Sequence, residues 1–407
     1  MIDYLRFLKE APRPLAFGFL LCFASSFGQT FFIALSGAEL RAAFELSHGG
    51  FGTAYSVATL GSGLLMIWLG GLLDRVSLGR FSLAVVIGLA GACALLAVAP
   101  HAAVLVLAFF ALRLTGQGLA THTAFTTMGR RFVMNRGKAI AIAALGLPAG
   151  EAVLPLLGVG AIDLFGWRGA WLAFGAVALA GFAPLTLWLS RAAAQAPQLR
   201  TRGADDPPEP RQWSRAEVLR DTRFWLILPA LLAMPVISTA FFFHQVHVVE
   251  AKGWSLTWFA AMFPVFAGAT VLAGTVTGSL VDRLGAVRLL PLFLVPAALG
   301  LLALAATDHP AAATAFMALV GATQGLGATL IQALWAELYG TRHLGAIRAL
   351  AQAAMVLGTA LGPILFGLAF DAGVTVEAAA LASAAWLVVM TLLLRFGLKR
   401  EPAPVGA

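Results

Sequence analysis

Apolar residues fill long stretches of this chain, and polar residues gather in short segments between them. A membrane-spanning helix needs roughly 20 apolar residues. Stretches of about that length occur at 14–37, 51–73, 81–100, 103–126, 138–161, 169–190, 224–249, 257–281, 287–306, 311–336, 345–370 and 376–396. Charged residues cluster between these stretches, which is typical of a polytopic membrane protein. The pattern predicts an all-α membrane protein with twelve transmembrane helices.

Composition supports this prediction. The chain has 407 residues, of which 60% are hydrophobic and only 11% charged, whereas soluble domains carry about 25% charged residues. The two cysteines, Cys22 and Cys93, lie in apolar stretches, where they are expected to pack as small hydrophobes rather than form a disulfide or a metal site. The N-terminal segment does not read as a cleavable signal peptide, so we expect the first helix to direct its own insertion.

The longest polar interruption divides the chain into two parts of six predicted helices each. It covers 191–222 and is rich in Pro, Arg and Asp. We therefore expect an N-terminal six-helix bundle at 1–190, a central cytoplasmic loop at 191–222 and a C-terminal six-helix bundle at 223–407. Within the loop, Ser214–Leu219 is predicted to form a short amphipathic piece on the membrane surface.

Lysine and arginine predict the orientation. Most of the 27 basic residues fall in the loops on the side that holds both termini, and cytoplasmic loops carry an excess of such residues. Both termini are therefore expected in the cytoplasm. The net charge of +8 then reflects topology, and no nucleic-acid partner is expected. The excess of arginine over lysine and the abundance of alanine favour a bacterial inner membrane.

A short motif occurs twice, 208 residues apart. The string GGLLDRVSLGR spans Gly70–Arg80 and GSLVDRLGAVR spans Gly278–Arg288. Each copy ends an apolar stretch, and the same offset relates further residues, such as Asp163 to Asp371. Two fused parallel halves are the plan of one large class of transporters. The shared positions of the two corners are Gly70, Asp74, Arg75 and Arg80 in the first and Gly278, Asp282, Arg283 and Arg288 in the second.

These corners resemble the signature loops of the Major Facilitator Superfamily, although the first copy carries two extra residues. Arg113 with the following Gly-Gln-Gly resembles the family's helix 4 signature, one residue out of step. The resemblance implies two six-helix bundles and a corner that latches the outward-open state. The alternative is that the corner charges only fix topology and a tight turn.

A narrower resemblance points to the monocarboxylate and oxalate/formate carrier branch. It rests on FGWRGAW at 165–171, RRFVMNRGKAIAIA at 130–143 and ELYGTRHLGAIRAL at 337–350. That branch moves small organic anions, often with protons, and usually carries a cationic residue on helix 8 or 11. The predicted helix 8 and the stretch from Ala349 to Phe370 lack one, which is a departure from the branch pattern.

Arg113 and Glu151 are predicted at mid-depth on helices 4 and 5. An isolated arginine at the bilayer centre costs roughly 3 kcal/mol on insertion scales, so such residues pair or line a wet cavity. We expect the two side chains to bind a polar substrate, a proton, or both in turn. A structural ion pair that locks the two helices together is the alternative.

Two histidines, His244 and His247, lie three residues apart and share a helix face in the outer third of helix 7. Histidine titrates near neutral pH, which suits proton coupling or a polar gate. An interfacial histidine pair that only packs against aromatic residues is the alternative. A metal site would need further ligands, and the sequence offers none, so we expect no metal.

Helices 1, 4, 7 and 10 line the pathway in this superfamily, and amides fall on three of them. Amides can both donate to and accept from a substrate, although any one of them could instead bond a neighbouring helix. We assign to the pathway Gln29, Gln117, Gln324 and Gln332.

Together these features predict a secondary active transporter that works by alternating access. The expected activity is proton-coupled uptake of a small polar organic solute, such as a monocarboxylate or another organic anion. The Gly-Pro antiporter signature is missing from helix 5, which favours uptake over the alternative, proton-coupled efflux of amphipathic compounds. A non-transporting membrane receptor or assembly factor is the alternative of another class. We expect no enzyme activity and no cofactor. The expected partners are a small-molecule substrate, protons and membrane lipid. The chain is expected to be a monomer.

Overall fold

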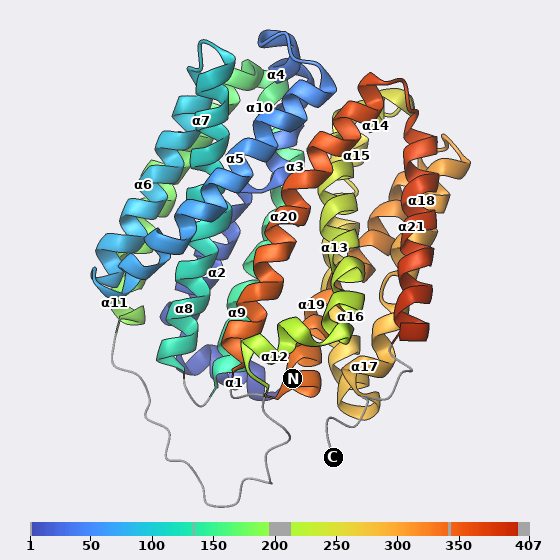
Figure 1. Cartoon of the computed structure of the whole chain (residues 1–407). Coiled ribbons are helices and arrows are strands. Elements are labelled where there is room, and N and C mark those ends of the chain that lie inside the picture. Colours follow the sequence, from blue (N-terminus) through green and yellow to red (C-terminus); the bar gives the residue numbers. More distant parts are fainter. Residues whose placement is uncertain (1, 133–134, 195–212, 341–342, 398–407) are drawn as a thin grey trace, which may run out of the picture.

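The computed structural model describes residues 2–132, 135–194, 213–340 and 343–397. Helices dominate these residues (Figure 1). The N-terminal half contains α1 (Ile2–Glu10), α2 (Pro12–Ala24), α3 (Thr30–Ile33), α4 (Gly37–Ala43), α5 (His48–Leu69), α6 (Leu78–Ala97), α7 (Ala102–Leu112), α8 (Thr121–Arg131), α9 (Arg136–Ala144), α10 (Gly146–Val177) and α11 (Ala183–Ala193).

The C-terminal half repeats this plan. It contains α12 (Arg215–Arg220), α13 (Thr222–Phe243), α14 (Gln245–Ala251), α15 (Leu256–Ala260), α16 (Phe263–Leu284), α17 (Ala286–Leu289), α18 (Val295–Ala306), α19 (Ala311–Tyr339), α20 (Leu344–Asp371) and α21 (Val376–Gly397). The two halves stand side by side. We call the end with α1, α12 and α17 the terminal end, and the end with α4 and α14 the distal end (Figure 1).

Twelve membrane crossings follow from the helix lengths. Ten helical stretches in the described residues are long and apolar enough to span, and the bent pair Pro12–Gly28 and Thr30–Ala43 adds one more. One of the ten, Arg136–Ala193, has 58 residues, or about 87 Å of helix at 1.5 Å per residue, which exceeds the roughly 30 Å hydrocarbon core. Gly166, with φ 65° and ψ 164°, breaks helical geometry inside it. This stretch therefore makes two crossings, and the predicted twelve-helix fold is confirmed.

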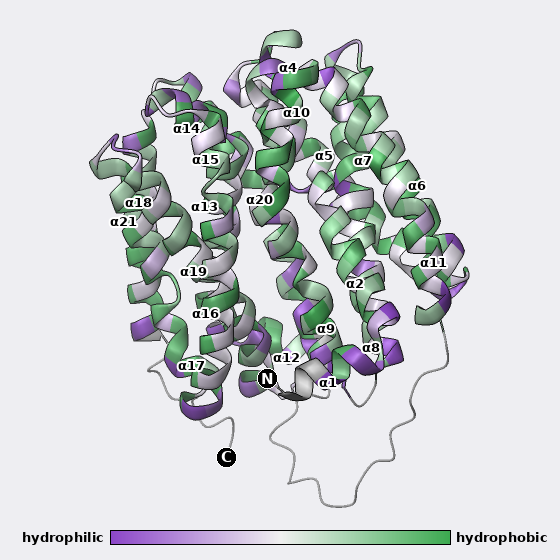
Figure 2. Ribbon diagram, turned by 180° about the vertical axis from the view of Figure 1, so that it is seen from behind, coloured by the Kyte–Doolittle hydropathy of each residue, from purple (hydrophilic) through white to green (hydrophobic). Residues whose placement is uncertain are grey.

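Hydropathy varies between the terminal end and the distal end of the molecule. Hydrophilic residues gather at the two ends of the molecule, and hydrophobic residues cover the helices between them (Figure 2). Many large apolar side chains on the outer surface are exposed, among them Ile67, Trp68 and Leu164. A soluble protein rarely leaves so much apolar surface in water, so this surface faces lipid.

The predicted central loop is only partly described, because 195–212 lie outside the described residues. Its last part belongs with the C-terminal half: the backbone N–H of Trp213 donates to the carbonyl of Tyr339 at 3.1 Å. Ser214 and Glu217 form a capping box that starts α12. Partial burial opposes ionisation of Asp221, but its hydrogen bonds from Arg223 outweigh burial and hold the pKa of Asp221 below its ordinary value. The connecting helix α12 is therefore fastened to the half that it precedes.

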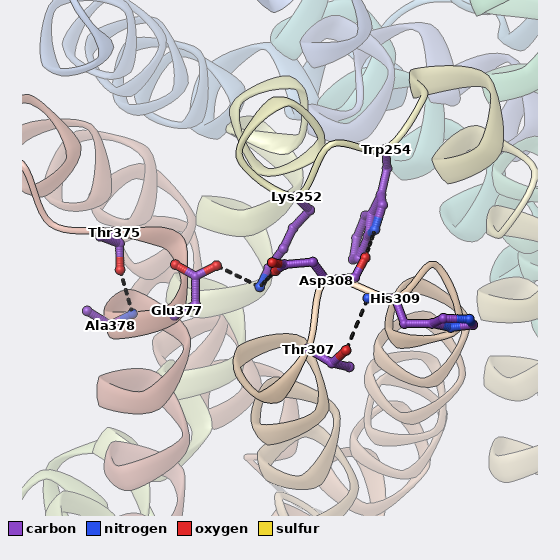
Figure 3. Close-up of polar contacts among 8 residues, drawn as sticks. All are labelled: Lys252, Trp254, Thr307, Asp308, His309, Thr375, Glu377 and Ala378. Carbon is purple, nitrogen blue, oxygen red and sulfur yellow. Dashed lines mark hydrogen bonds and ion pairs between the residues drawn. The ribbon is translucent and has the colours of Figure 1, made fainter.

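A buried lysine ties three loops together at the distal end of the C-terminal half (Figure 3). The Lys252 ammonium lies 2.8 Å from a carboxylate oxygen of Asp308 and 2.6 Å from one of Glu377, and its side chain is 0% exposed. The Trp254 indole donates to the Asp308 carbonyl at 2.5 Å. Burial alone would lower the pKa of Lys252, but the two carboxylates outweigh burial and raise that pKa above its ordinary value. Lys252 is thus charged and joins Asp308 and Glu377 by two ion pairs.

Replacing Lys252 by methionine is expected to lower the free energy of unfolding by about 1–3 kcal/mol, because it leaves two carboxylates without their shared cation. Thermal unfolding of the purified protein in detergent measures the effect. Lys9→Met, the same change at an exposed position on α1, is the control and should leave the melting temperature unchanged. Equal melting temperatures for the two variants would show that the two ion pairs of Lys252 do not stabilise the fold.

Candidate functional site

The buried guanidinium of Arg113 is the centre of the candidate site. Arg113 begins a π-helical segment, Arg113–Ala120, that continues α7 into α8. Its side chain is 3% exposed. One terminal nitrogen donates to the Gly28 carbonyl at 3.3 Å, and Nε has no hydrogen-bond partner. Because a guanidinium carries five donors, most of its hydrogen-bonding capacity is unused.

Tyr55 links this arginine to the other half of the protein. The Tyr55 ring centroid lies 5.2 Å from the guanidinium carbon of Arg113, and the Tyr55 hydroxyl is 2.6 Å from that of Thr30. On its other side the ring packs 4.5 Å from the ring of Phe243, at the end of α13. Tyr55 is fully buried. Sequence reasoning missed it, although the chain has only three tyrosines, and a rare polar aromatic inside an apolar stretch was the available signal.

Glu151 does not form an ion pair with Arg113 in this conformation. Glu151 is half-buried on α10, and no cation lies within ion-pair distance of it among the described residues. The arginine instead extends towards α5 and the short turn Ser25–Gly28. Beside Glu151, Gly150 packs so closely on the turn Ser25–Gly28 that a Cβ there would collide with the Ser26 hydroxyl. The two charged groups therefore do not pair with each other in this conformation.

The two predicted histidines meet a third one that sequence reasoning did not include. His244 is buried and its Nε2 lies 2.9 Å from the Pro363 carbonyl oxygen, to which it donates. His48, at the first position of α5, has its ring centroid 4.3 Å from that of His247 and 5.9 Å from that of His244. No group of three or more potential ligands among the described residues has metal-binding geometry. The cluster is instead a contact between the halves at the distal end.

The predicted amides divide into two kinds. Gln29 and Gln117 are half-buried in the N-terminal half, whereas Gln324 and Gln332 are exposed on α19. A fifth amide, Gln245, was missed: its side chain is fully buried and its amide nitrogen donates to the Phe31 carbonyl at 2.6 Å. Gln245 follows His244 directly, so the polar string at the end of α13 was the signal for it. It forms another bond between the halves.

The two repeated corners lie at the terminal end, where each bonds to residues of its own half. Asp74 forms an ion pair with Arg130 of α8, and His122 lies 3.3 Å from the Gly70 carbonyl oxygen. An open cavity of about 450 Å³ lies between them. In the second corner the N-terminus of α17 is capped by Glu337, which accepts from Ala286 at 2.6 Å. The remaining charged corner residues are exposed: Arg75, Arg80, Asp282, Arg283 and Arg288. The glycine of this corner, Gly278, has open space around it. The predicted latch stays a prediction for another conformation.

The last residue of α20 caps a helix of the other half. Asp371 accepts from the backbone N–H groups of His48 at 2.9 Å and Gly49 at 2.8 Å. A carboxylate at a helix N-terminus satisfies free N–H groups and is favoured by the helix dipole. The sequence repeat pairs Asp371 with Asp163, but Asp163 is exposed and makes no hydrogen bond to α15, whose first turn is capped by its own Ser255 at 3.1 Å.

Comparison with known proteins identifies the family. The profile of the Major Facilitator Superfamily matches residues 18–307 and 259–407. The chain belongs to the Major Facilitator Superfamily. It is a membrane transporter and not an enzyme. A search of the curated proteins found no match.

Two solved structures of Major Facilitator Superfamily transporters have the same fold. Both are of a bacterial homologue of the human lysosomal transporter Spinster. The inward-facing, unoccupied structure has a TM-score of 0.69 and 16% identity, covering 96% of this chain and 99% of that one. The inward-facing, occupied structure has a TM-score of 0.70 and 16% identity, covering 95% and 98%.

The structure shows the transporter in a conformation in which its distal end is closed. Hydrogen bonds and ring contacts between the halves occur at the distal end and in the middle: Gln245 to Phe31, Asp371 to α5, and Phe51 to Phe243 with ring centroids 4.6 Å apart. Ser56 also donates to the Ala360 carbonyl at 2.5 Å. All of the bonds named here lie at the distal end or in the middle of the interface. Arg113 and Tyr55 lie directly behind this closed contact.

Proposed function

We propose that this transporter couples the entry of protons to the uptake of a small polar organic solute that carries an anionic group, such as a monocarboxylate. The observation that carries the proposal is the buried, incompletely bonded guanidinium of Arg113. A desolvated charge needs a partner, and no carboxylate lies within ion-pair distance of it among the described residues. A ligand carboxylate would supply the missing charge and accept two parallel hydrogen bonds.

The proposed orientation follows from the basic loops. With both termini in the cytoplasm of a bacterium, the closed distal end faces outward. A solute would then reach Arg113 from the cytoplasmic side. Tyr55 and Thr30 supply hydroxyl groups beside the guanidinium. Because Tyr55 also packs on Phe243 of the other half, a ligand that moves Tyr55 would act on the contact that keeps the distal end shut.

Glu151 is the proposed proton carrier. The sequence places it at mid-depth like Arg113, and among the described residues no cation lies within ion-pair distance to hold it ionised. A carboxyl group in such a place can take up and release a proton without breaking an ion pair. The separation of Glu151 from Arg113 in this conformation suits a carrier in which proton and solute occupy different sites.

The substrate class is tested by thermal unfolding of the purified protein with acetate, lactate and pyruvate, each beside its uncharged amide. A ligand at 100 times its Kd stabilises a protein by about 2.7 kcal/mol. We expect at least one carboxylate, and not its amide, to raise the melting temperature. Stabilisation by the amides to the same extent would remove the anionic group from the proposal, and stabilisation only by amphipathic cations would favour efflux of such compounds.

Glu151→Gln tests the coupling. In proteoliposomes with an imposed pH gradient, we expect this variant to lose accumulation of the carboxylate found above, because the amide cannot carry a proton. Exchange of labelled for unlabelled solute across the same membrane should continue, since it needs no net proton movement. Gradient-driven accumulation at the wild-type level in Glu151→Gln would contradict the assignment.

A further inference from the structure

The contact between the halves at the distal end is built around the first turn of α5. Asp371 of the C-terminal half holds the backbone N–H groups of His48 and Gly49 at 2.9 and 2.8 Å. The approach is close: a Cβ on Gly367 of α20 would collide with the His48 carbonyl oxygen. This cap exists only while the halves touch here, because its acceptor and its donors belong to different halves.

Three imidazoles surround the cap, and they too come from both halves. His48 belongs to the N-terminal half, and His244 and His247 to the C-terminal half. The ring of Phe370 fills the space between them, with its centroid 5.3 Å from that of His244 and 4.6 Å from that of His247. The His48 and His247 ring centroids are only 4.3 Å apart, so charges placed on them would lie close together across the interface.

The closed contact requires His48 to be neutral. A terminal nitrogen of Arg41 lies 3.2 Å from Nε2 of His48. A guanidinium can only donate, so Nε2 of His48 is the acceptor and its proton sits on Nδ1. That Nδ1 is buried and has no hydrogen-bond partner. A protonated His48 would have no lone pair for Arg41 and would face it as a second cation.

The charges around the three imidazoles decide the effect of protonation. Arg41 faces them from α4, Glu250 from α14 and Asp371 from α20. Both oxygens of Asp371 already accept from the α5 backbone. When all three imidazoles are protonated, His48 and Arg41 on one half face His244 and His247 on the other, and the two carboxylates cannot balance these four cations. The closed state therefore binds fewer protons than the separated state, and acid shifts the equilibrium towards separation.

We propose that Arg41, His48, His244, His247 and Asp371 form a proton-sensitive lock. The lock holds the distal end shut near neutral pH and releases it when the compartment on the distal side becomes acidic. The proposal concerns how the transporter opens and does not depend on which solute it carries. Protons on the distal side would then act twice, first in releasing the lock and later as the coupled ion.

A distance measurement without substrate tests the lock. Spin labels are placed at Val98→Cys and Ala306→Cys, which lie at exposed distal positions on opposite halves; the native Cys22 and Cys93 are fully buried. Double electron–electron resonance is recorded at about pH 8 and about pH 5, on either side of the histidine pKa range. We expect the ratio of separated to closed populations to rise about tenfold in acid, since several like charges are added at short distance.

Two variants assign the response. His48→Gln keeps an acceptor for Arg41 and the backbone N–H groups for Asp371 but cannot be charged, so the acid response should fall by at least about half. The triple variant, in which His244 and His247 are also replaced by glutamine, should lose the acid response completely. The matched control is His101→Gln with His309→Gln, which changes two exposed distal histidines outside the cluster and should keep the full response.

Asp371→Asn tests the cap itself. It weakens the capping of α5 at every pH, and the separated population should therefore rise already at neutral pH. A wild-type distance distribution that is the same at both pH values would overturn the lock. So would an undiminished acid response in both His48→Gln and the triple variant, because the sensing groups would then lie elsewhere.

Discussion

Arg113→Gln is expected to abolish binding and transport of the anionic solute while the fold stays as stable as the wild type or becomes more stable. Truncating one partner of a buried charge pair costs about 2–5 kcal/mol, so affinity should fall by about 30-fold or more. Stability should not fall, because burying this guanidinium costs free energy in the free protein, and one long hydrogen bond and the contact with the Tyr55 ring offset only part of that cost. Thermal unfolding with and without the stabilising carboxylate measures both quantities.

Arg168→Gln is the matched control for this prediction. Arg168 is an exposed arginine at the distal end of the N-terminal half, and it donates to the carbonyl oxygens of Ala97 and Ala99 at 2.6 and 3.1 Å. Its loss should lower the melting temperature and leave the ligand-induced shift intact. If Arg113→Gln lowered stability like Arg168→Gln and still bound the carboxylate, Arg113 would be a structural residue.

Gly52→Val is expected to trap the transporter with its distal end apart and to lower transport at least tenfold. Gly52 of α5 lies against α20 so closely that a Cβ would collide with the Pro363 carbonyl oxygen. The obstacle is backbone on both sides, which cannot rotate away as a side chain can. Overpacking of this kind costs about 1–3 kcal/mol or more. Here that cost falls only on the closed state, so the equilibrium shifts towards separation by about 5- to 150-fold.

The spin-label pair at Val98 and Ala306 reports this shift, and solute exchange reports the loss of transport. Gly91→Val is the control, because Gly91 on α6 has open space around it, and it should behave as the wild type in both measurements. A closed distal end in Gly52→Val would mean that α5 and α20 can slide to a new register, and the close approach would then not govern the gate.

Much of the axial arrangement could be predicted from the sequence. Hydropathy shows how deep a residue lies, so the spans, the loop at 191–222 and the terminal position of the Asp-Arg corners were within reach. The break at Gly166 was also implied, because two predicted spans flank it. These features depend on local composition and on the thickness of the bilayer, and neither requires knowledge of which helices touch.

The rotation of each helix and the contacts between the halves could not be predicted in this way. Arg113 and Glu151 were predicted at mid-depth, but depth says nothing of direction, and the arginine side chain turns towards Tyr55 rather than Glu151. Asp371 was visible only as the repeat partner of Asp163. Asp371 caps α5 only in the conformation with the distal end closed, whereas the sequence has to be compatible with the open conformation as well. His48 stands at a helix start, where it reads as an ordinary surface residue.

The single cap at Asp371 makes the two seams between the halves unequal. The seam of α5 and α20 is hydrogen-bonded across the interface in its distal part, whereas no such bond joins the described residues of α10 and α16, and Asp163 is exposed. The halves should therefore part in sequence, first along α10 and α16 and then along α5 and α20. On the distal side, the first opening would then form between α10 and α16 only. An arriving solute would approach Glu151 before Arg113.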